Sequence, residues 1–212
     1  MAKRLKDQAQ NLELIMEKSN TKKMSLNIFF DTLGCAKNEV DTFKMEGLVK
    51  GAGHNIVEDA SLADVIILNT CAFIEAATQE SIDTFFEYRN YFKDKKIIVC
   101  GCLVSRYKDE LKKSLNEADA FISCDDEEKI CELITNLNVK PSNNDDTNEA
   151  LSSVFGYVKI SEGCNRRCSY CTIPFIRGKY KSSSYDEIVK DVEEQRNLGA
   201  KEIVLVAQDC GV

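Results

Sequence analysis

Three cysteines crowd one short segment of this sequence, EGCNRRCSYC, where Cys164, Cys168 and Cys171 form the pattern C-x3-C-x2-C. Three thiolates on one loop can bind three irons of a [4Fe–4S] cluster, which normally has four cysteine ligands. The fourth iron would then stay open to an external ligand. The alternatives are a zinc knuckle and three buried thiols, and the spacing together with a strand predicted just before the loop favours the cluster.

An open iron on this loop suits the amino and carboxylate groups of S-adenosylmethionine (SAM). Tyr170, directly before the third cysteine, could lie against the adenine of such a ligand. The strand predicted before the loop would place it at the carboxyl end of a parallel sheet, where barrel enzymes keep their chemistry. The loop is therefore the first candidate for an active centre.

A second set of three cysteines, Cys35, Cys71 and Cys102, is spread along the first half of the chain. No local spacing links them, but each follows a predicted strand. Carboxyl ends of parallel strands gather at one edge of an open sheet, which is the usual ligand crevice. Three thiolates could therefore converge there, although periodicity alone leaves three unrelated loop cysteines equally open.

The other four cysteines are predicted to be small buried hydrophobes, as free cysteine commonly is; they are Cys100, Cys124, Cys131 and Cys210. Ten cysteines without a secretion signal make a disulfide framework a poor explanation, because the cytosol keeps thiols reduced. Metal binding or redox chemistry is the better expectation. His54 is the single histidine, so a Cys/His zinc site has little to draw on.

The bulk composition fits a globular protein of the cytoplasm. Hydrophobic residues make up 43% and charged residues 30% of the 212 residues. No run of 18 apolar residues occurs, and the N-terminus lacks the apolar core of a signal peptide, so we expect neither a membrane span nor secretion. The net charge of −7 argues against a nucleic-acid-binding surface over the whole chain, and the basic residues gather in 157–181.

Apolar strands alternate with amphipathic helices over residues 25–138. Strands are predicted at 26–30, 63–69, 96–100 and 118–122, and helices at 39–50, 78–92, 106–115 and 127–136. Near-continuous apolar strands separated by helices indicate an open parallel sheet covered on both faces. The fold class is therefore α/β.

The remaining segments suggest a second unit and its connections. Residues 1–24 are read as a polar N-terminal extension, and the polar stretch 139–153 as a linker. Residues 154–212 hold a strand at 154–160, a helix opened by the capping-box pair Ser184 and Glu187, and a strand at 202–207. A closed (β/α)8 barrel needs about 250 residues. We therefore expect a truncated barrel.

Four segments resemble radical SAM enzymes of the methylthiotransferase family. TLGCAKNEVDT (32–42), NTCAFIEAATQESI (69–82) and CGCLVSRY (100–107) look like the three cysteine motifs of its N-terminal domain, and KISEGCNRRCSYCTIPFIRGKYKS (159–182) like its SAM loop. Together with the AQD of 207–209, the last segment is most similar to the branch that modifies an aspartate of a small-subunit ribosomal protein. The implied fold is a methylthiotransferase N-terminal domain followed by the first βα units of a partial TIM barrel.

The resemblance also implies cofactors and roles. Cys164, Cys168 and Cys171 would hold the cluster that cleaves SAM, and Cys35, Cys71 and Cys102 an auxiliary [4Fe–4S] cluster involved in sulfur donation. The resulting radical would take hydrogen from an unactivated C–H at the β-carbon of an aspartate, where sulfur and a methyl group would be inserted. Gln208 and Asp209 would contact SAM. An electron donor such as flavodoxin or ferredoxin is implied as a partner.

Three other functions stay open at this point. A tRNA adenosine methylthiotransferase would share the same motifs with another substrate. An iron–sulfur electron-transfer protein would use both clusters only to shuttle electrons, although four-cysteine ligand sets suit it better. A zinc-binding interaction module is the third. The family continues beyond these segments into a fuller barrel and a substrate-recognition domain, so we expect the present chain to be inactive alone.

Overall fold

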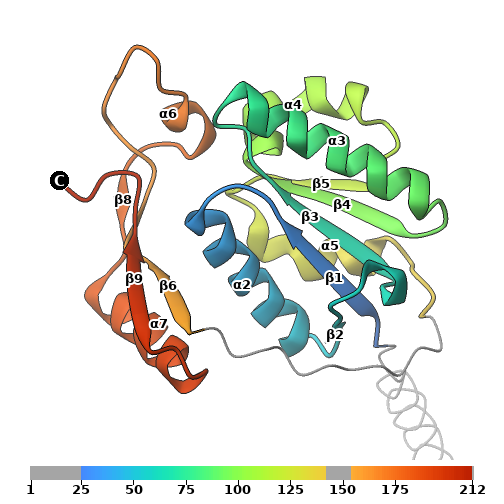
Figure 1. The fold of residues 1–212 in the computed structure, drawn as a ribbon, viewed down its shortest axis with the longest axis horizontal. Coiled ribbons are helices and arrows are strands. Elements are labelled where there is room, and N and C mark those ends of the chain that lie inside the picture. Colours follow the sequence, from blue (N-terminus) through green and yellow to red (C-terminus); the bar gives the residue numbers. More distant parts are fainter. Residues whose placement is uncertain (1–24, 142–153, 212) are drawn as a thin grey trace, which may run out of the picture.

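A computed structural model describes residues 25–141 and 154–211. The predicted N-terminal extension and most of the predicted linker lie outside the described residues. Two units are visible in Figure 1, a larger one built around a sheet and a smaller one that contains the carboxyl-terminal strand. Within the described ranges, none of the helices has the length and apolar character needed to cross a membrane.

The first unit is a parallel sheet, as predicted, but it has five strands rather than the four predicted, in the order β2-β1-β3-β4-β5. Its strands are β1 (Asn27–Thr32), β2 (Asn55–Ile56), β3 (Val65–Thr70), β4 (Lys96–Gly101) and β5 (Ala120–Ile122). Its helices are α2 (Ala36–Gly51), α3 (Glu75–Tyr91), α4 (Cys102–Ser114) and α5 (Ile130–Asn136), with short 3-10 turns η1 (Ala60–Leu62) and η2 (Glu127–Lys129).

Helices cover both faces of this sheet because its strands are apolar on both sides. All six residues of the central strand β3 are buried. On one face Phe85 of α3 and Leu103 of α4 pack against the sheet. On the other face Met45 of α2 and Ile130 of α5 do the same. Figure 1 shows the helices that cover the sheet. Each face thus removes a continuous apolar surface from water, which is the main stabilising contribution to this unit.

The second unit pairs two parallel strands, β6 (Phe155–Lys159) and β9 (Glu202–Val206), with the helix α7 (Tyr185–Asn197) between them in sequence. The predicted capping box is confirmed, since Ser184 Oγ accepts from the Glu187 amide and the Glu187 carboxylate accepts from the Ser184 amide. A short antiparallel hairpin of β7 (Ser161–Glu162) and β8 (Lys181–Ser182) and the helix α6 (Ile173–Ile176) were not predicted.

The two units are packed against each other. Strand β6 lies against α2, and α6 lies against α4. Ile176 of α6 is buried in the same apolar cluster as Leu103. Ile176, which belongs to the loop between β7 and β8, therefore anchors this loop of the second unit on the first unit.

Three helices that begin beside the site start earlier than predicted, and α2 begins at Ala36 rather than at Glu39. Helix α3 begins at Glu75 and α4 begins at Cys102, each a few residues earlier than predicted. Helix α4 is also kinked at Lys108, whose φ is 46°.

Candidate functional site

The three cysteines of the first set lie at the carboxyl ends of neighbouring strands. Cys35 follows β1 and precedes the first turn of α2, Cys71 follows β3 directly, and Cys102 is the first residue of α4 after β4. Strands β1, β3 and β4 are adjacent in the sheet. The structure thus brings the three segments to one edge, as the strand pattern predicts.

Glycine lets these three strand ends approach closely. Gly34 has a φ of +103°, and a Cβ at this position would lie 2.6 Å from the Cβ and 2.9 Å from the Sγ of Cys71. Gly101 has a φ of +90°, and a Cβ there would lie 2.3 Å from Asn69 Oδ1. Both conformations are ones that residues with a Cβ rarely adopt. The loops that carry Cys35 and Cys102 therefore depend on glycine to reach the end of β3.

Asn38 ties the same loops together with hydrogen bonds. Its Nδ2 donates to Leu33 O at 2.6 Å and to Thr70 O at 3.2 Å. Its Oδ1 lies 3.7 Å from Cys102 Sγ. One side chain from the first turn of α2 thus contacts the ends of β1 and β3 and the start of α4.

The thiol of Cys102 lies in surroundings that favour its anionic form. A hydrogen bond from Cys124 and the positive charge of Arg177 lower the pKa of Cys102, although burial acts in the opposite direction. Arg177 Nη2 donates to Cys102 Sγ at 3.2 Å. Cys71 is also buried, whereas Cys35 is exposed. Thiolates are the form in which cysteine binds metals.

Cys100 is only two residues from Cys102, yet it belongs to the opposite face of the sheet. It is fully buried beside Ile98 and Ile122, and its Sγ donates to Leu68 O at 3.5 Å. Gly101 ends β4 with a positive φ, so the chain turns before Cys102 enters α4. Cys100 is thus a core residue, as predicted.

The second cysteine set lies on the loop between β7 and β8. Gly163 has a φ of +70°, and a Cβ there would lie 2.3 Å from Lys179 O, so the two sides of the loop touch at this glycine. Cys164 N donates to Gly178 O at 3.2 Å, and Cys171 N donates to Cys168 O at 3.1 Å. Cys164 is buried, Cys171 is half-buried and Cys168 is exposed. The loop was predicted to follow the parallel strand directly, whereas in the structure it follows the short hairpin strand β7.

Two of the three residues predicted to contact SAM lie beside this loop. Asp209 lies just beyond β9, and its carboxylate is ion-paired with Arg166, whose Nη2 is 3.1 Å from Oδ1. Asp209 Oδ2 lies 3.9 Å from Cys164 Sγ. Gln208 Nε2 donates to Glu162 Oε1 at 3.0 Å, while its buried Oε1 has no hydrogen-bond partner in the described part of the chain. Tyr170 is 85% exposed.

A buried charge network that sequence reasoning missed joins the two cysteine sets. Asp41 of α2 is paired with Arg177 and, at 2.6 Å, with Lys159 at the end of β6. In Glu162 of β7, Oε2 is 2.7 Å from Lys159 Nζ and Oε1 is 3.2 Å from Lys37 Nζ. Burial alone would raise the pKa of the Glu162 carboxyl, but Lys159 and Arg177 outweigh it and lower that pKa to about 2.

A sequence signal for part of this network exists. Asp41 lies four residues after Lys37 and three residues after Asn38. A helix that starts directly after Cys35 therefore places both residues on the same face as Asp41. The predicted helix started only at Glu39, which hid the pattern. Nothing local identifies Lys159 and Arg177 as the partners.

The cysteine sets fit iron–sulfur ligation in chemistry. Across residues 25–141 and 154–211, no group of three or more His, Cys, Asp or Glu side chains forms a metal-holding arrangement. The side chains of Cys35 and Cys168 are exposed. Hydrogen-bond donors lie beside two of the sulfurs, namely Arg177 Nη2 beside Cys102 Sγ and the Arg166 amide, 3.4 Å from Cys164 Sγ.

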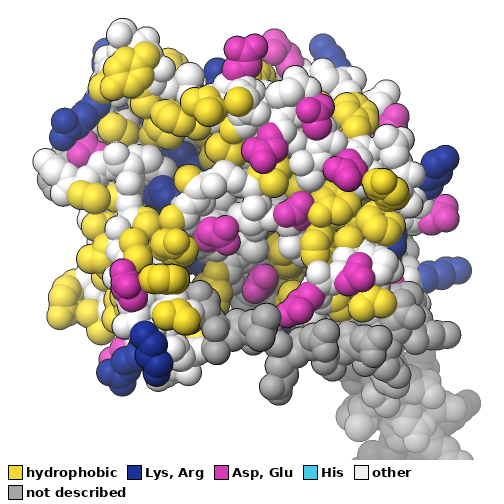
Figure 2. All heavy atoms as spheres, viewed as in Figure 1, with side chains coloured by type: hydrophobic (Ala, Val, Ile, Leu, Met, Phe, Trp, Pro, Cys, Tyr) yellow, Lys and Arg dark blue, Asp and Glu magenta, His cyan; other side chains and the backbone are white. Residues whose placement is uncertain are grey.

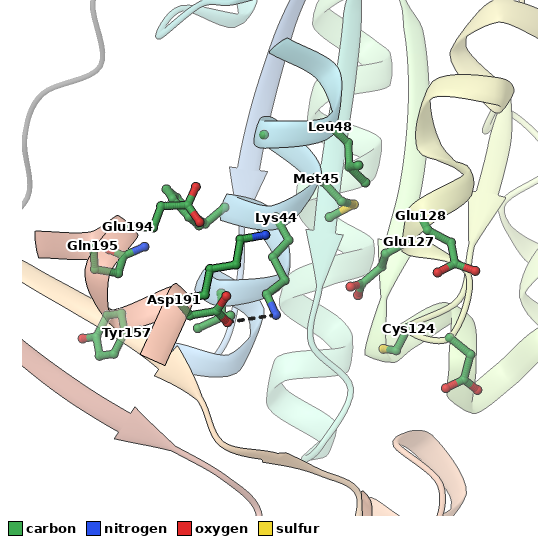
Figure 3. Close-up of a pocket in the computed structure, with 15 residues that line it drawn as sticks. Lys44, Met45, Leu48, Cys124, Glu127, Glu128, Tyr157, Asp191, Glu194 and Gln195 are labelled. Carbon is green, nitrogen blue, oxygen red and sulfur yellow. Dashed lines mark ion pairs between the residues drawn. The ribbon is translucent and has the colours of Figure 1, made fainter. Parts of the chain in front are cut away.

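A pocket of about 590 Å³ lies away from both cysteine loops, around α2 (Figure 3). Lys44 of α2 and Asp191 of α7 both line it, and Lys44 Nζ is 3.4 Å from Asp191 Oδ2. On the other side of α2 lies Glu127. Burial, reinforced by the Asp41 carboxylate, raises the pKa of the Glu127 carboxyl to about 9, and its Oε1 has no hydrogen-bond partner in the described residues.

Two family profiles match the chain in succession. Residues 27–123 match the family described as Uncharacterized protein family UPF0004. Residues 158–210 match the Radical SAM superfamily. The first match covers the sheet that carries Cys35, Cys71 and Cys102, and the second covers the loop that carries Cys164, Cys168 and Cys171.

Curated relatives have the same two parts. The proteins called ribosomal protein uS12 methylthiotransferase RimO are 42% identical over 190 residues in Thermosipho africanus and 39% identical over 199 residues in Clostridioides difficile. In each case the match covers 87% of this chain and 44% or 45% of the relative. The chain therefore spans somewhat less than half the length of these relatives.

A solved structure supports the fold. The radical SAM methyltransferase TsrM from Kitasatospora setae superposes with a TM-score of 0.60 over 87% of this chain and 48% of the other, at 11% sequence identity. At this identity the likeness concerns the fold alone. The predicted arrangement, a helix-flanked parallel sheet followed by the start of a radical SAM domain, is confirmed.

Proposed function

We propose, for a chain that belongs to the RimO-like radical SAM proteins, that the two cysteine sets hold two [4Fe–4S] clusters and that the protein acts as a methylthiotransferase. The observation that carries this proposal is the division of six cysteines into two sets of three, one in the UPF0004 segment and one in the radical SAM segment. Sets of three leave one iron of each cluster open to an external ligand.

When bound, the cluster at Cys164, Cys168 and Cys171 would supply the electron that cleaves SAM, and the cluster at Cys35, Cys71 and Cys102 would take part in sulfur donation. The protein's own part is to bind, orient and exclude water. Asp209 and Gln208, which lie beside the loop, are our candidates for contacting SAM, and Tyr170 is the aromatic candidate. The boundaries 25–138 and 154–212 remain our proposal for the two domains.

The proposed substrate is an aspartate of ribosomal protein uS12, with sulfur inserted at its β-carbon. The names of the relatives support uS12 as the substrate, and the surface charge supports a protein rather than a nucleic acid as the substrate class. On the face drawn in Figure 2, acidic side chains spread over the five-stranded unit, while most Lys and Arg lie at the rim. A tRNA-binding enzyme needs extended phosphate contacts, so this surface favours a protein substrate over a tRNA adenosine. A ribosomal substrate would place the enzyme in the cytoplasm. The electron donor that we propose for the SAM-cleaving cluster is a flavodoxin or a ferredoxin.

Iron content tests the two-cluster proposal. After anaerobic reconstitution with iron and sulfide, the chain should bind about eight irons, the sum of two four-iron clusters. Replacing all three cysteines of either set with alanine should remove about half of that iron, whereas Cys100→Ala should remove almost none. Iron loss on Cys100→Ala, or zinc in place of iron, would contradict the ligand assignment.

Mass spectrometry tests the substrate. In a strain that lacks the gene, uS12 should lose the mass of one methylthio group while tRNA keeps all its modifications. The reverse result would make the tRNA branch correct. Reduction without any SAM cleavage by the whole protein would favour an electron-transfer protein instead.

A further inference from the structure

Arg177 links the loop of one cysteine set to a cysteine of the other. It follows α6 on the loop that carries Cys164, Cys168 and Cys171, and only 2% of its side chain is exposed. Its Nη2 donates to Cys102 Sγ at 3.2 Å and to Asn38 Oδ1 at 2.6 Å, while its Nη1 is paired with Asp41. The guanidinium therefore touches a proposed auxiliary ligand, although 75 residues separate Arg177 from Cys102.

The ion pairs around Arg177 contain one more cation than carboxylate, and the Glu127 carboxyl interacts electrostatically with Lys159 and Arg177 from outside these pairs. Three cations, Arg177, Lys159 and Lys37, surround two carboxylates, Asp41 and Glu162. The sum is +1. Burying a cation costs free energy unless an anion or a hydrogen-bond acceptor compensates it. Arg177 is the cation of this network that contacts the Cys102 sulfur, at 3.2 Å.

We infer that Arg177 is a positioning residue that holds Cys102 and, through it, tunes the reduction potential of the auxiliary cluster from the SAM loop. This inference rests on the proposed function. Hydrogen bonds to cluster sulfurs and nearby charge are among the factors that set cluster potentials. A positive donor at a ligating sulfur favours the reduced, more negative cluster, so it raises the potential. Because Arg177 sits on the SAM loop, movement of that loop would be felt at the auxiliary cluster.

The test uses the chain in which Cys164, Cys168 and Cys171 are all alanine, so that only the auxiliary cluster can form. The reduction potential and the electron paramagnetic resonance spectrum are measured in this parent and in Arg177→Met. We expect a shift of the potential to more negative values and a changed spectrum in Arg177→Met. Arg177→Lys, which keeps the charge but loses the planar fork, should show a smaller shift in the same direction.

Arg89→Met is the matched control. Arg89 is also a mostly buried arginine with a carboxylate partner, Asp119, at 2.7 Å. That pair lies at the amino end of β4, where Asp119 accepts from the Ile97 amide, far from the cysteines. Loss of the Arg89–Asp119 pair should lower the stability of the fold without changing the reduction potential of the auxiliary cluster. A general loosening of the fold would therefore show in both variants, and loss of the Cys102 contact only in the Arg177 variants.

Outcomes separate this inference from the proposed function. A parent that takes up no iron refutes the proposed function and the inference with it. A parent with a full cluster, and Arg177→Met with the same potential and spectrum, refutes the inference alone. If Arg177→Met fails to fold, Arg177→Lys decides, since an unchanged potential and spectrum in that variant would overturn the role of Arg177.

Discussion

The carboxylate of Asp41 and the ammonium of Lys159 lie 2.6 Å apart, although 118 residues separate them in the chain. Asp41 belongs to the five-stranded unit and Lys159 ends the first strand of the radical SAM unit. Only 1% of the Asp41 side chain is exposed. Since Asp41 also pairs with Arg177, this one carboxylate compensates two cations at the interface between the units.

Replacing Asp41 should therefore destabilise the protein strongly. Asp41→Ala leaves Lys159 and Arg177 with one fewer anion in a buried site, and removing one partner of a buried pair typically costs about 3–5 kcal/mol. Urea unfolding monitored by circular dichroism measures the loss. The control is Lys44→Ala, which breaks a more exposed pair between the units, Lys44 Nζ with Asp191 Oδ2 at 3.4 Å, where the Lys44 side chain is 46% exposed. That change should cost less than about 1 kcal/mol, and equal losses would show that burial is not the cause.

Gly34 should be intolerant of even a methyl group. Its φ of +103° and the 2.6 Å approach to Cys71 Cβ mean that Gly34→Ala must shift the loop before Cys35. We expect lower stability and a selective loss of the iron held by the Cys35, Cys71 and Cys102 set. The control is Gly47→Ala in the middle of α2, where a Cβ meets nothing within 4 Å. It should stabilise the chain by about 0.5–1 kcal/mol and leave iron content unchanged.

Glu127 should make stability depend on pH. Its folded pKa of about 9 lies above its ordinary value of 4.5, so between these values the native state binds more protons than the unfolded state. The contribution of Glu127 to stability is then full below pH 4.5 and falls as pH rises toward 9. Glu127→Gln keeps the neutral form at every pH.

Thermal unfolding at two pH values checks this expectation. At pH ~5 the Glu127→Gln variant should unfold close to the temperature of the parent, and at pH ~8.5 it should be more stable, by an amount on the order of 2 kcal/mol. Glu128→Gln, at the exposed neighbouring position, is the control and should show no such pH-dependent gain. A gain for Glu127→Gln that is the same at both pH values would exclude titration of this carboxyl as the cause.

Much of the fold follows from local patterns in the sequence. Apolar runs such as that of β3 and the helical spacing between them predicted the parallel sheet, because burial of both sheet faces imposes that pattern on every strand. The capping box at Ser184 is likewise a local signal. The short elements were not predicted. β2, β7, β8 and α6 contain two to four residues each, too few to show a period, and they form because neighbouring segments supply their partners.

By itself, the sequence determined which cysteines follow which strands, and therefore that Cys35, Cys71 and Cys102 reach one edge of the sheet, because strand polarity alone decides this. Only the tertiary structure decided that Arg177 contacts Cys102 and that Lys159 pairs with Asp41. Those contacts join segments more than 70 residues apart, and no spacing along a chain records which distant charges will be buried against each other. The packing of α6 and β6 on the first unit makes that choice.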